Sequence, residues 1–171
     1  MGAVIGLLAG AALLAISMKG RAMTNDNTDT GPELRYFQPS EFGPWWPKMN
    51  RELLFKLDEF RHRWGAPVII SPANGSLGRH QGSGGESQHN VDAWGEVRAV
   101  DVFPKVNGRY MTRAADRRKA HELAREVGFT GIGLYTDTQP GNMLHVDVRG
   151  GNRVAEWSRV GGDYLDIGQV V

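Results

Sequence analysis

The chain has 171 residues, of which 40% are hydrophobic and 23% are charged, a composition typical of one globular domain of ordinary size. Its formal net charge is +1 with both signs interspersed, so it lacks the basic stripe that nucleic-acid backbones require, and we expect no nucleic-acid partner. Cysteine is absent, which excludes disulfides, thiolate nucleophiles and sulfur-based zinc sites. A metal site in this chain must therefore use histidine and carboxylate side chains.

Residues 1–18 contain the most hydrophobic stretch of the chain. The run from Ala3 to Met18 carries no charge and is slightly shorter than the ~20 residues that span a bilayer core. Three glycines are spaced four apart, as in membrane helices that pack closely: Gly2, Gly6 and Gly10. Self-association through this helix is therefore possible. We expect an N-terminal hydrophobic helix that acts as a membrane anchor or an uncleaved signal-anchor. A cleaved signal and a helix buried against another protein are the open alternatives.

The next segment, residues 19–32, is rich in Asn, Asp, Thr and Gly and has almost no large apolar side chains, as is typical of a flexible linker. Lys19 and Arg21 favour a cytoplasmic position for this flank, whereas an export signal would place the rest of the chain outside. The orientation across a membrane therefore stays open. We expect one folded domain over residues 33–171.

Hydrophobic patterns in residues 33–171 predict both helices and strands. Leu53, Leu57 and Phe60 recur at helical spacing, and Gly65 ends that helix. A polar, glycine-rich loop over residues 73–86 is long, and long loops usually carry function. The expected helices cover residues 47–64 and 112–127, and the expected strands cover residues 68–71, 97–103, 132–135 and 143–148. This order predicts an α+β domain with a small, mainly antiparallel sheet and flanking helices.

Histidine and aspartate residues occur where they can meet on one face of such a sheet. Asp101 is flanked by apolar strand residues, and a buried carboxylate of this kind needs a partner. His145 and Asp147 lie two apart on the last strand and share one face, while His89 lies in the loop that leads to the Asp101 strand. Three nitrogen and oxygen ligands with an open fourth position are the pattern of a catalytic zinc site. The alternative is an exposed loop histidine beside a hydrogen-bonded His145–Asp147 pair.

Four motifs, in their order along the chain, resemble the M15 family of zinc peptidases. They are Ser-x-His at residues 87–89, Ala-x-Asp at 99–101, Gly-Ile-Gly-Leu-Tyr at 131–135 and Leu-His-Val-Asp-Val-Arg at 144–149. The resemblance covers roughly residues 67–164 and is greatest to the branch that ends in His-Val-Asp. The family includes D-alanyl-D-alanine carboxypeptidases and phage endolysins that cut peptidoglycan stem peptides. The resemblance implies the small α+β zinc-peptidase fold, in agreement with the predicted elements.

The resemblance implies that His89, Asp101 and His145 are the ligands of a Zn²⁺ ion. The interval between the first histidine and the aspartate is longer here by five residues around positions 90–95, so Asp92 competes with Asp101 for the ligand role. Another branch of the family carries its glutamate base three residues before the last ligand. Asn142 stands at that position here and cannot accept a proton at neutral pH.

A general base is still required for amide hydrolysis, and Asp147 is the expected one. Two other roles stay open for Asp147: orienting the His145 ring, or binding zinc and leaving His145 as the base. Arg79 matches the family arginine that holds the substrate carbonyl or carboxylate, a function suited to a guanidinium group. Ser87 and Tyr135, which belong to the shared motifs, are expected to contact the substrate.

These residues together predict a zinc metallopeptidase that cuts peptide bonds in peptidoglycan stem peptides or cross-links, in cell-wall remodelling, phage lysis or phage entry. The expected partners are peptidoglycan peptide and, through the N-terminal helix, a membrane. The catalytic domain would face the cell wall or periplasm, or be associated with a virion. The alternatives are a membrane-tethered module that binds cell-wall peptide without cutting it, and a virion structural protein with an inactive peptidase-like domain.

Overall fold

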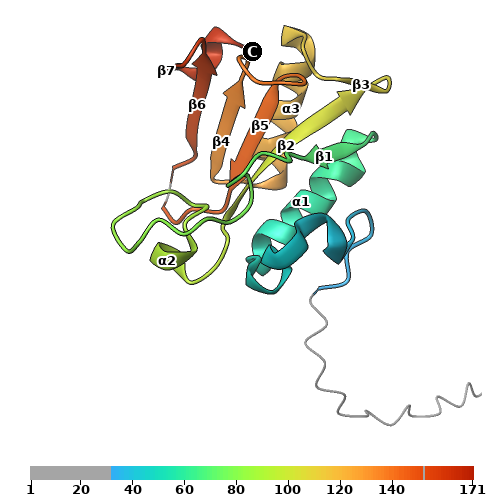
Figure 1. The fold of residues 1–171 in the computed structure, drawn as a ribbon. Helices are drawn as coiled ribbons and strands as arrows, with labels where there is room; N and C mark the ends of the chain where they lie inside the picture. The colour runs from blue at the N-terminus through green and yellow to red at the C-terminus, as the bar shows by residue number, and fades with distance from the viewer. Residues whose placement is uncertain (1–31, 152) are drawn as a thin grey trace, which may run out of the picture.

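A computed structural model describes residues 32–151 and 153–171 of the chain (Figure 1). The hydrophobic helix expected over residues 1–18 and almost all of the expected linker lie outside the described residues. Within the described part, no helix is both long enough and apolar enough to cross a bilayer. The described residues form an α+β fold with a mixed, mostly antiparallel sheet and flanking helices, which confirms the predicted fold class at that level.

The first helix begins later than the sequence predicted. A 3₁₀ segment, η1 (Pro39–Lys48), comes first, and α1 (Arg51–Trp64) starts only after Asn50. The side chain of Asn50 accepts a hydrogen bond of 3.0 Å from the backbone N–H of Leu53, which caps the helix. Gly65 ends α1 as predicted, with a φ of 73° that favours glycine.

The sheet has the strand order β1-β2-β5-β4-β6-β7, and the short strand β3 pairs with β2. Only the β4–β6 pair is parallel, among the described strands; the other pairs are antiparallel. The strands are β1 (Val68–Ile70), β2 (Ala99–Val106), β3 (Arg109–Tyr110), β4 (Gly131–Tyr135), β5 (Met143–Asp147), β6 (Ala155–Val160) and β7 (Asp163–Leu165). The remaining elements are α2 (Val91–Trp94), α3 (Ala114–Val127) and η2 (Ile167–Gln169).

One face of the sheet packs against the helices and forms the core. Alternate strand residues such as Val100, Ile132 and Leu144 are fully buried together with Leu53 and Leu57 of α1. Figure 1 shows α1 and α3 on the same side of the sheet. Because successive strand residues point to opposite faces, Asp101 and His145 lie on the face that these helices leave uncovered.

Besides the 3₁₀ segments η1 and η2, four short elements were not predicted from the sequence: α2, β3, β6 and β7. Strand β6 has the sequence AEWSRV, in which charged residues interrupt the apolar pattern that marks a buried strand. Strand β2 also runs beyond the predicted end at residue 103. It continues through Pro104, whose carbonyl still accepts a hydrogen bond of 3.0 Å from Met111.

Candidate metal centre

The loop before β2 places His89 in the site through a buried asparagine. Asn90 is fully buried, and its side-chain nitrogen donates hydrogen bonds of 2.9 Å to the carbonyls of Gly82 and Gly85. The backbone N–H of Arg79 donates to the carbonyl of His89 over 2.9 Å, which closes the base of the loop. The glycine-rich loop is therefore anchored at both ends, and His89 is held against the sheet.

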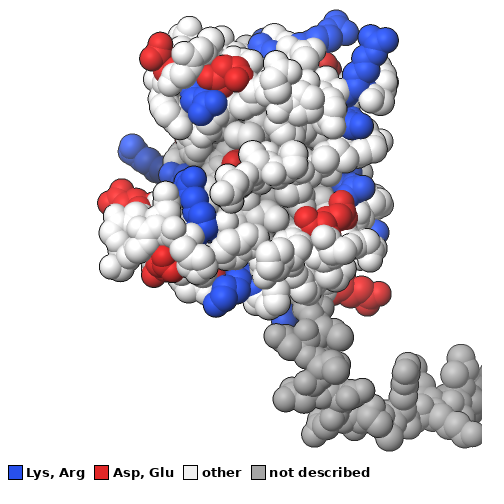
Figure 2. Space-filling model, in the orientation of Figure 1, with Lys and Arg blue, Asp and Glu red and all other residues white. Residues whose placement is uncertain are grey.

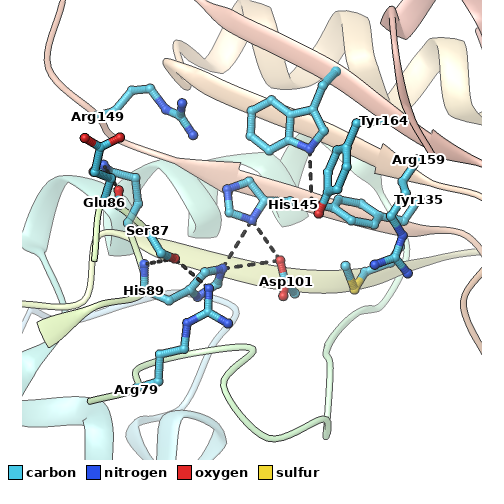
Figure 3. Close-up of a pocket in the computed structure, with 13 residues that line it drawn as sticks. Arg79, Glu86, Ser87, His89, Asp101, Tyr135, His145, Arg149, Arg159 and Tyr164 are labelled. Carbon is cyan, nitrogen blue, oxygen red and sulfur yellow. Dashed lines mark hydrogen bonds and ion pairs between the residues drawn. The ribbon is translucent and has the colours of Figure 1, made fainter. Parts of the chain in front are cut away.

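Strand pairing brings the other two ligand candidates together. Asp101 of β2 and His145 of β5 are register partners across an antiparallel pair, so their side chains stand beside each other on one face. The Nδ1 atom of His145 lies 2.9 Å from Oδ1 of Asp101 and 3.2 Å from Nε2 of His89. Figure 3 shows the three side chains turned toward one another.

The two imidazole rings are held so that their free nitrogens face each other. Nδ1 of His89 lies 2.5 Å from the carbonyl oxygen of Leu77, which can only accept a hydrogen bond. Nε2 of His145 lies 2.9 Å from Oδ2 of Asp147, which as a carboxylate also only accepts. Each ring thus keeps a proton on its outer nitrogen, and in the neutral form Nε2 of His89 and Nδ1 of His145 would present lone pairs to the same point. With the Asp101 carboxylate, three potential ligand atoms converge there.

The distances between the ligand atoms of His89, Asp101 and His145 are suitable for binding one metal ion. The ligand atoms of His89, Asp101 and His145 all lie within 4.8 Å of one another. Zinc binds nitrogen and oxygen at about 2.0–2.2 Å, so two ligands of a tetrahedral site stand about 3.3 Å apart. The distances of 2.9, 3.2 and 3.5 Å among the three side chains bracket that value. This group of buried or half-buried side chains can hold a metal ion, as the sequence predicted.

In the absence of metal, a proton takes the central position. Burial disfavours the imidazolium form of His145, but hydrogen bonds to Asp101 and Asp147 outweigh it and raise the pKa of His145 to about 9. Burial raises the pKa of the Asp101 and Asp147 carboxyl groups. The hydrogen bonds from His145 outweigh burial and keep both pKa values well below the ordinary value. The metal-free site is therefore an imidazolium between two carboxylates.

Asp92, the alternative ligand, lies in a different environment. Its Oδ1 is 2.7 Å from Nδ1 of His80, and its Oδ2 accepts a hydrogen bond of 2.8 Å from the backbone of Gly82. Asp92 is exposed and belongs to α2, whereas Asp101 belongs to the sheet. The structure thus brings Asp101 to His89 and His145, and Asp92 organises the glycine-rich loop.

Asp147 does not line the cavity, and it contacts the His145 ring through Nε2. Its carboxylate is fully buried. Besides His145, it binds Arg149, whose Nε and Nη2 atoms lie 2.9 and 2.5 Å from its oxygens. These contacts are those of a carboxylate that orients a metal-binding histidine, one of the roles left open by the sequence.

A glycine on the neighbouring strand makes room for that carboxylate. Gly131 of β4 is the register partner of Asp147, and a Cβ atom at Gly131 would overlap the Asp147 carboxylate. We expect Gly131→Ala to lower the free energy of unfolding by about 1–3 kcal/mol, as overpacked cores do, and to weaken metal binding by displacing Asp147. Urea unfolding and metal titration measure both effects. Gly84→Ala is the matched control, because a Cβ at Gly84 meets no atom within 4 Å.

A cavity of about 370 Å³ opens over the metal-ligand group. The predicted substrate-contacting residues Arg79, Ser87 and Tyr135 all line it. Nη2 of Arg79 donates a hydrogen bond of 2.7 Å to Oγ of Ser87. In residues 32–151 and 153–171, no carboxylate pairs with Arg79, whose side chain bonds Ser87 and whose buried Nε atom has no hydrogen-bond partner. The Arg79 guanidinium thus lines the cavity with no carboxylate partner among these residues.

Several lining residues were not proposed as site residues from the sequence: Glu86, Gln88, Met143, Arg149, Trp157, Arg159 and Tyr164. Trp157 and Arg159 lie two apart on β6, so recognition of that strand would have placed both on the cavity face. Glu86 has no local signal, because it follows a run of glycines in an irregular loop. On the face seen in Figure 2, basic and acidic side chains are both scattered.

Comparisons of the chain with protein-family models, with curated proteins and with solved structures find no match.

Proposed function

We propose that this protein is a zinc-dependent peptidase that hydrolyses peptide bonds in peptidoglycan stem peptides or cross-links. The observation that carries the proposal is the convergence of three metal-ligand atoms, from His89, Asp101 and His145, at the floor of an open cavity. The motif resemblance to M15 peptidases supports the same reaction and supplies the substrate class.

Zinc is the metal that suits this donor set best. Two imidazoles and one carboxylate at these separations match a catalytic zinc site with one position left for substrate or water. Such an ion, when bound, polarises the scissile carbonyl and lowers the pKa of a water molecule at the open position. His89 and His145 each have an acceptor on the outer ring nitrogen, which keeps the inner nitrogen deprotonated for the metal.

The other cavity residues would bind and orient the substrate. Arg79, which lines the cavity, would bind a carbonyl or carboxylate oxygen of the peptide, and Ser87 holds Arg79 in position. Asp147 would keep the His145 ring in its metal-binding tautomer. If Asp147 also moves a proton, as the sequence suggests, it must do so through that ring.

Digestion of purified peptidoglycan tests the proposal directly. The zinc-loaded protein should release new amino and carboxyl termini, which mass spectrometry assigns to one bond type. Protein treated with a chelator and the variant Asp101→Ala should release none, because both lack the metal. Zinc-loaded protein that sediments with peptidoglycan and releases no termini would instead support a binding module, and protein that does neither would support a structural role.

The proposed location follows from the substrate. Peptidoglycan lies outside the cytoplasmic membrane, so the domain over residues 33–171 would face the cell wall or periplasm, or be carried by a virion. The hydrophobic residues 1–18 would anchor it as a membrane anchor or signal-anchor, with residues 19–32 as the linker.

A further inference from the structure

Tyr135 stands at the end of β4, beside the metal-ligand group. Its side chain is only 9% exposed, and it lines the cavity together with His89, Asp101 and His145. Figure 3 shows its hydroxyl directed toward the ligand group from the side opposite Glu86. A buried phenol in such a position presents one polar atom to whatever occupies the cavity.

The hydrogen bond from Trp157 determines what that hydroxyl can do. Nε1 of Trp157 lies 3.1 Å from the Tyr135 oxygen, and an indole N–H can only donate. The Tyr135 oxygen therefore accepts this bond, and its own proton can be donated to the neighbouring Tyr164 hydroxyl or to a ligand in the cavity. Burial, the Tyr164 hydroxyl and the charge of Asp101 all raise the pKa of Tyr135, so the phenol keeps its proton and is a donor.

Trp157 is itself held in place by the sheet. One row of register partners crosses four strands: Asp101, His145, Gly133 and Trp157. A Cβ atom at Gly133 would lie 2.5 Å from the Trp157 ring, so only glycine leaves room for the indole to lie over that strand. The indole lies 5.1 Å from the His145 ring, measured between ring centroids. The Tyr135 hydroxyl is thus positioned relative to His145 by side chains packed on the sheet rather than by a loop.

We propose that the Tyr135 hydroxyl donates the hydrogen bond that stabilises the oxyanion formed on the scissile carbonyl, an assignment that rests on the proposed peptidase function. In this reaction the water oxygen bonds to the carbonyl carbon, and the π electron pair moves onto the carbonyl oxygen. The Tyr135 hydroxyl shares its proton with that oxygen without transferring it. The carbonyl then re-forms as the carbon–nitrogen bond breaks, and the leaving nitrogen takes the proton that the water has lost.

The test is Tyr135→Phe, which removes one oxygen and keeps the ring. Loss of one oxyanion donor lowers kcat by about 10²–10³ in known enzymes, and we expect a fall of that size on soluble muropeptides with KM changed less than roughly threefold. Affinity for a phosphinate pseudodipeptide, whose tetrahedral anion mimics the intermediate, should fall by a similar factor when measured by calorimetry. Zinc content and melting temperature should match those of the wild type.

Two further variants complete the experiment. Tyr110→Phe removes a hydroxyl from β3, outside the cavity, and should leave kcat and phosphinate affinity unchanged. Trp157→Phe keeps the Tyr135 phenol but frees it from the indole N–H, and a partial loss of kcat and phosphinate affinity is expected. If Tyr135→Phe does not fold, Trp157→Phe provides the test instead.

The outcomes separate this assignment from the proposed function. An active wild type with a Tyr135→Phe variant of equal kcat and equal phosphinate affinity would overturn only the role of Tyr135. Loss of zinc in Tyr135→Phe would also overturn it, because the hydroxyl would then support the metal site instead. A zinc-loaded wild type that hydrolyses no muropeptide would overturn the peptidase function and this assignment with it.

Discussion

The purified protein should contain about one zinc ion per chain, and His145→Ala should abolish its binding. His145 contributes one of three ligand atoms, and its loss leaves His89 and Asp101, a pair too weak for a stable zinc site. Because metal that binds only the folded state stabilises it, by about 4 kcal/mol when free zinc is a thousandfold above its Kd, chelation should lower the melting temperature of the wild type. Elemental analysis and thermal unfolding with and without chelator measure the two effects.

Control variants show whether the loss of zinc is specific to His89, Asp101 and His145. His62→Ala removes an exposed histidine from α1 and should retain zinc. Asp101→Ala should lose zinc, whereas Asp92→Ala should retain it, since Asp92 contacts His80 and the Gly82 backbone. The reverse ranking of the two aspartates would move the ligand assignment to Asp92. A zinc-free protein that is as stable as the zinc-loaded one would contradict the metal centre.

The same unfolding measurements should depend on pH between 6.5 and 9 in the metal-free protein and much less in the zinc-loaded protein. The pKa of His145 in the folded, metal-free protein is raised to about 9 from its ordinary value of 6.5. A raised pKa stabilises the fold below pH 6.5, and this contribution is lost as the pH rises toward 9. Zinc displaces the proton from His145, so zinc affinity should increase over the same pH range. The stabilisation by zinc is thus expected to be largest near pH 9.

Asp147→Asn should weaken zinc binding and reduce hydrolysis, and the response to added zinc identifies the role of the carboxylate. Asparagine keeps an oxygen acceptor for the ring of His145 but removes the charge that pairs with Arg149. Loss of an orienting partner costs about 10–100-fold in metal affinity or activity. Loss of a general base costs about 10²–10⁴-fold in rate with the metal retained. From the buried contacts of Asp147, we expect weaker zinc binding and recovery of most activity in excess zinc.

Glu86→Gln is the companion variant, because Glu86 and Asp101 are the carboxylates that line the cavity. If Asp147 only orients His145, a proton acceptor must come from elsewhere, and Glu86→Gln should then lower kcat with zinc retained. If Asp147→Asn stays inactive at saturating zinc while Glu86→Gln is fully active, Asp147 is the base. Steady-state kinetics on soluble muropeptides at several zinc concentrations distinguish these results.

Some parts of the site follow from sequence patterns because they depend on neighbouring residues. Strand alternation places His145 and Asp147 on one face, and that follows from a spacing of two. The absence of cysteine restricts any metal to nitrogen and oxygen ligands. The end of α1 at Gly65 also follows from neighbouring residues. The α+β fold class likewise follows from the helix and strand patterns of short segments.

Other parts required the tertiary structure because they depend on residues far apart in the chain. Alternation tells which face His145 occupies but not which strand lies beside it, and the register with Asp101 is set by hydrogen bonds between strands 44 residues apart. The parallel pairing of β6 with β4, which brings Trp157 to Tyr135, leaves no local signal in a charged strand. The Leu77 carbonyl that orients His89 is likewise a backbone atom, and its position is determined by the folding of the whole loop. Composition and alternation therefore determined which chemical groups this protein can use, whereas the long-range pairing of its backbone decided which of them meet.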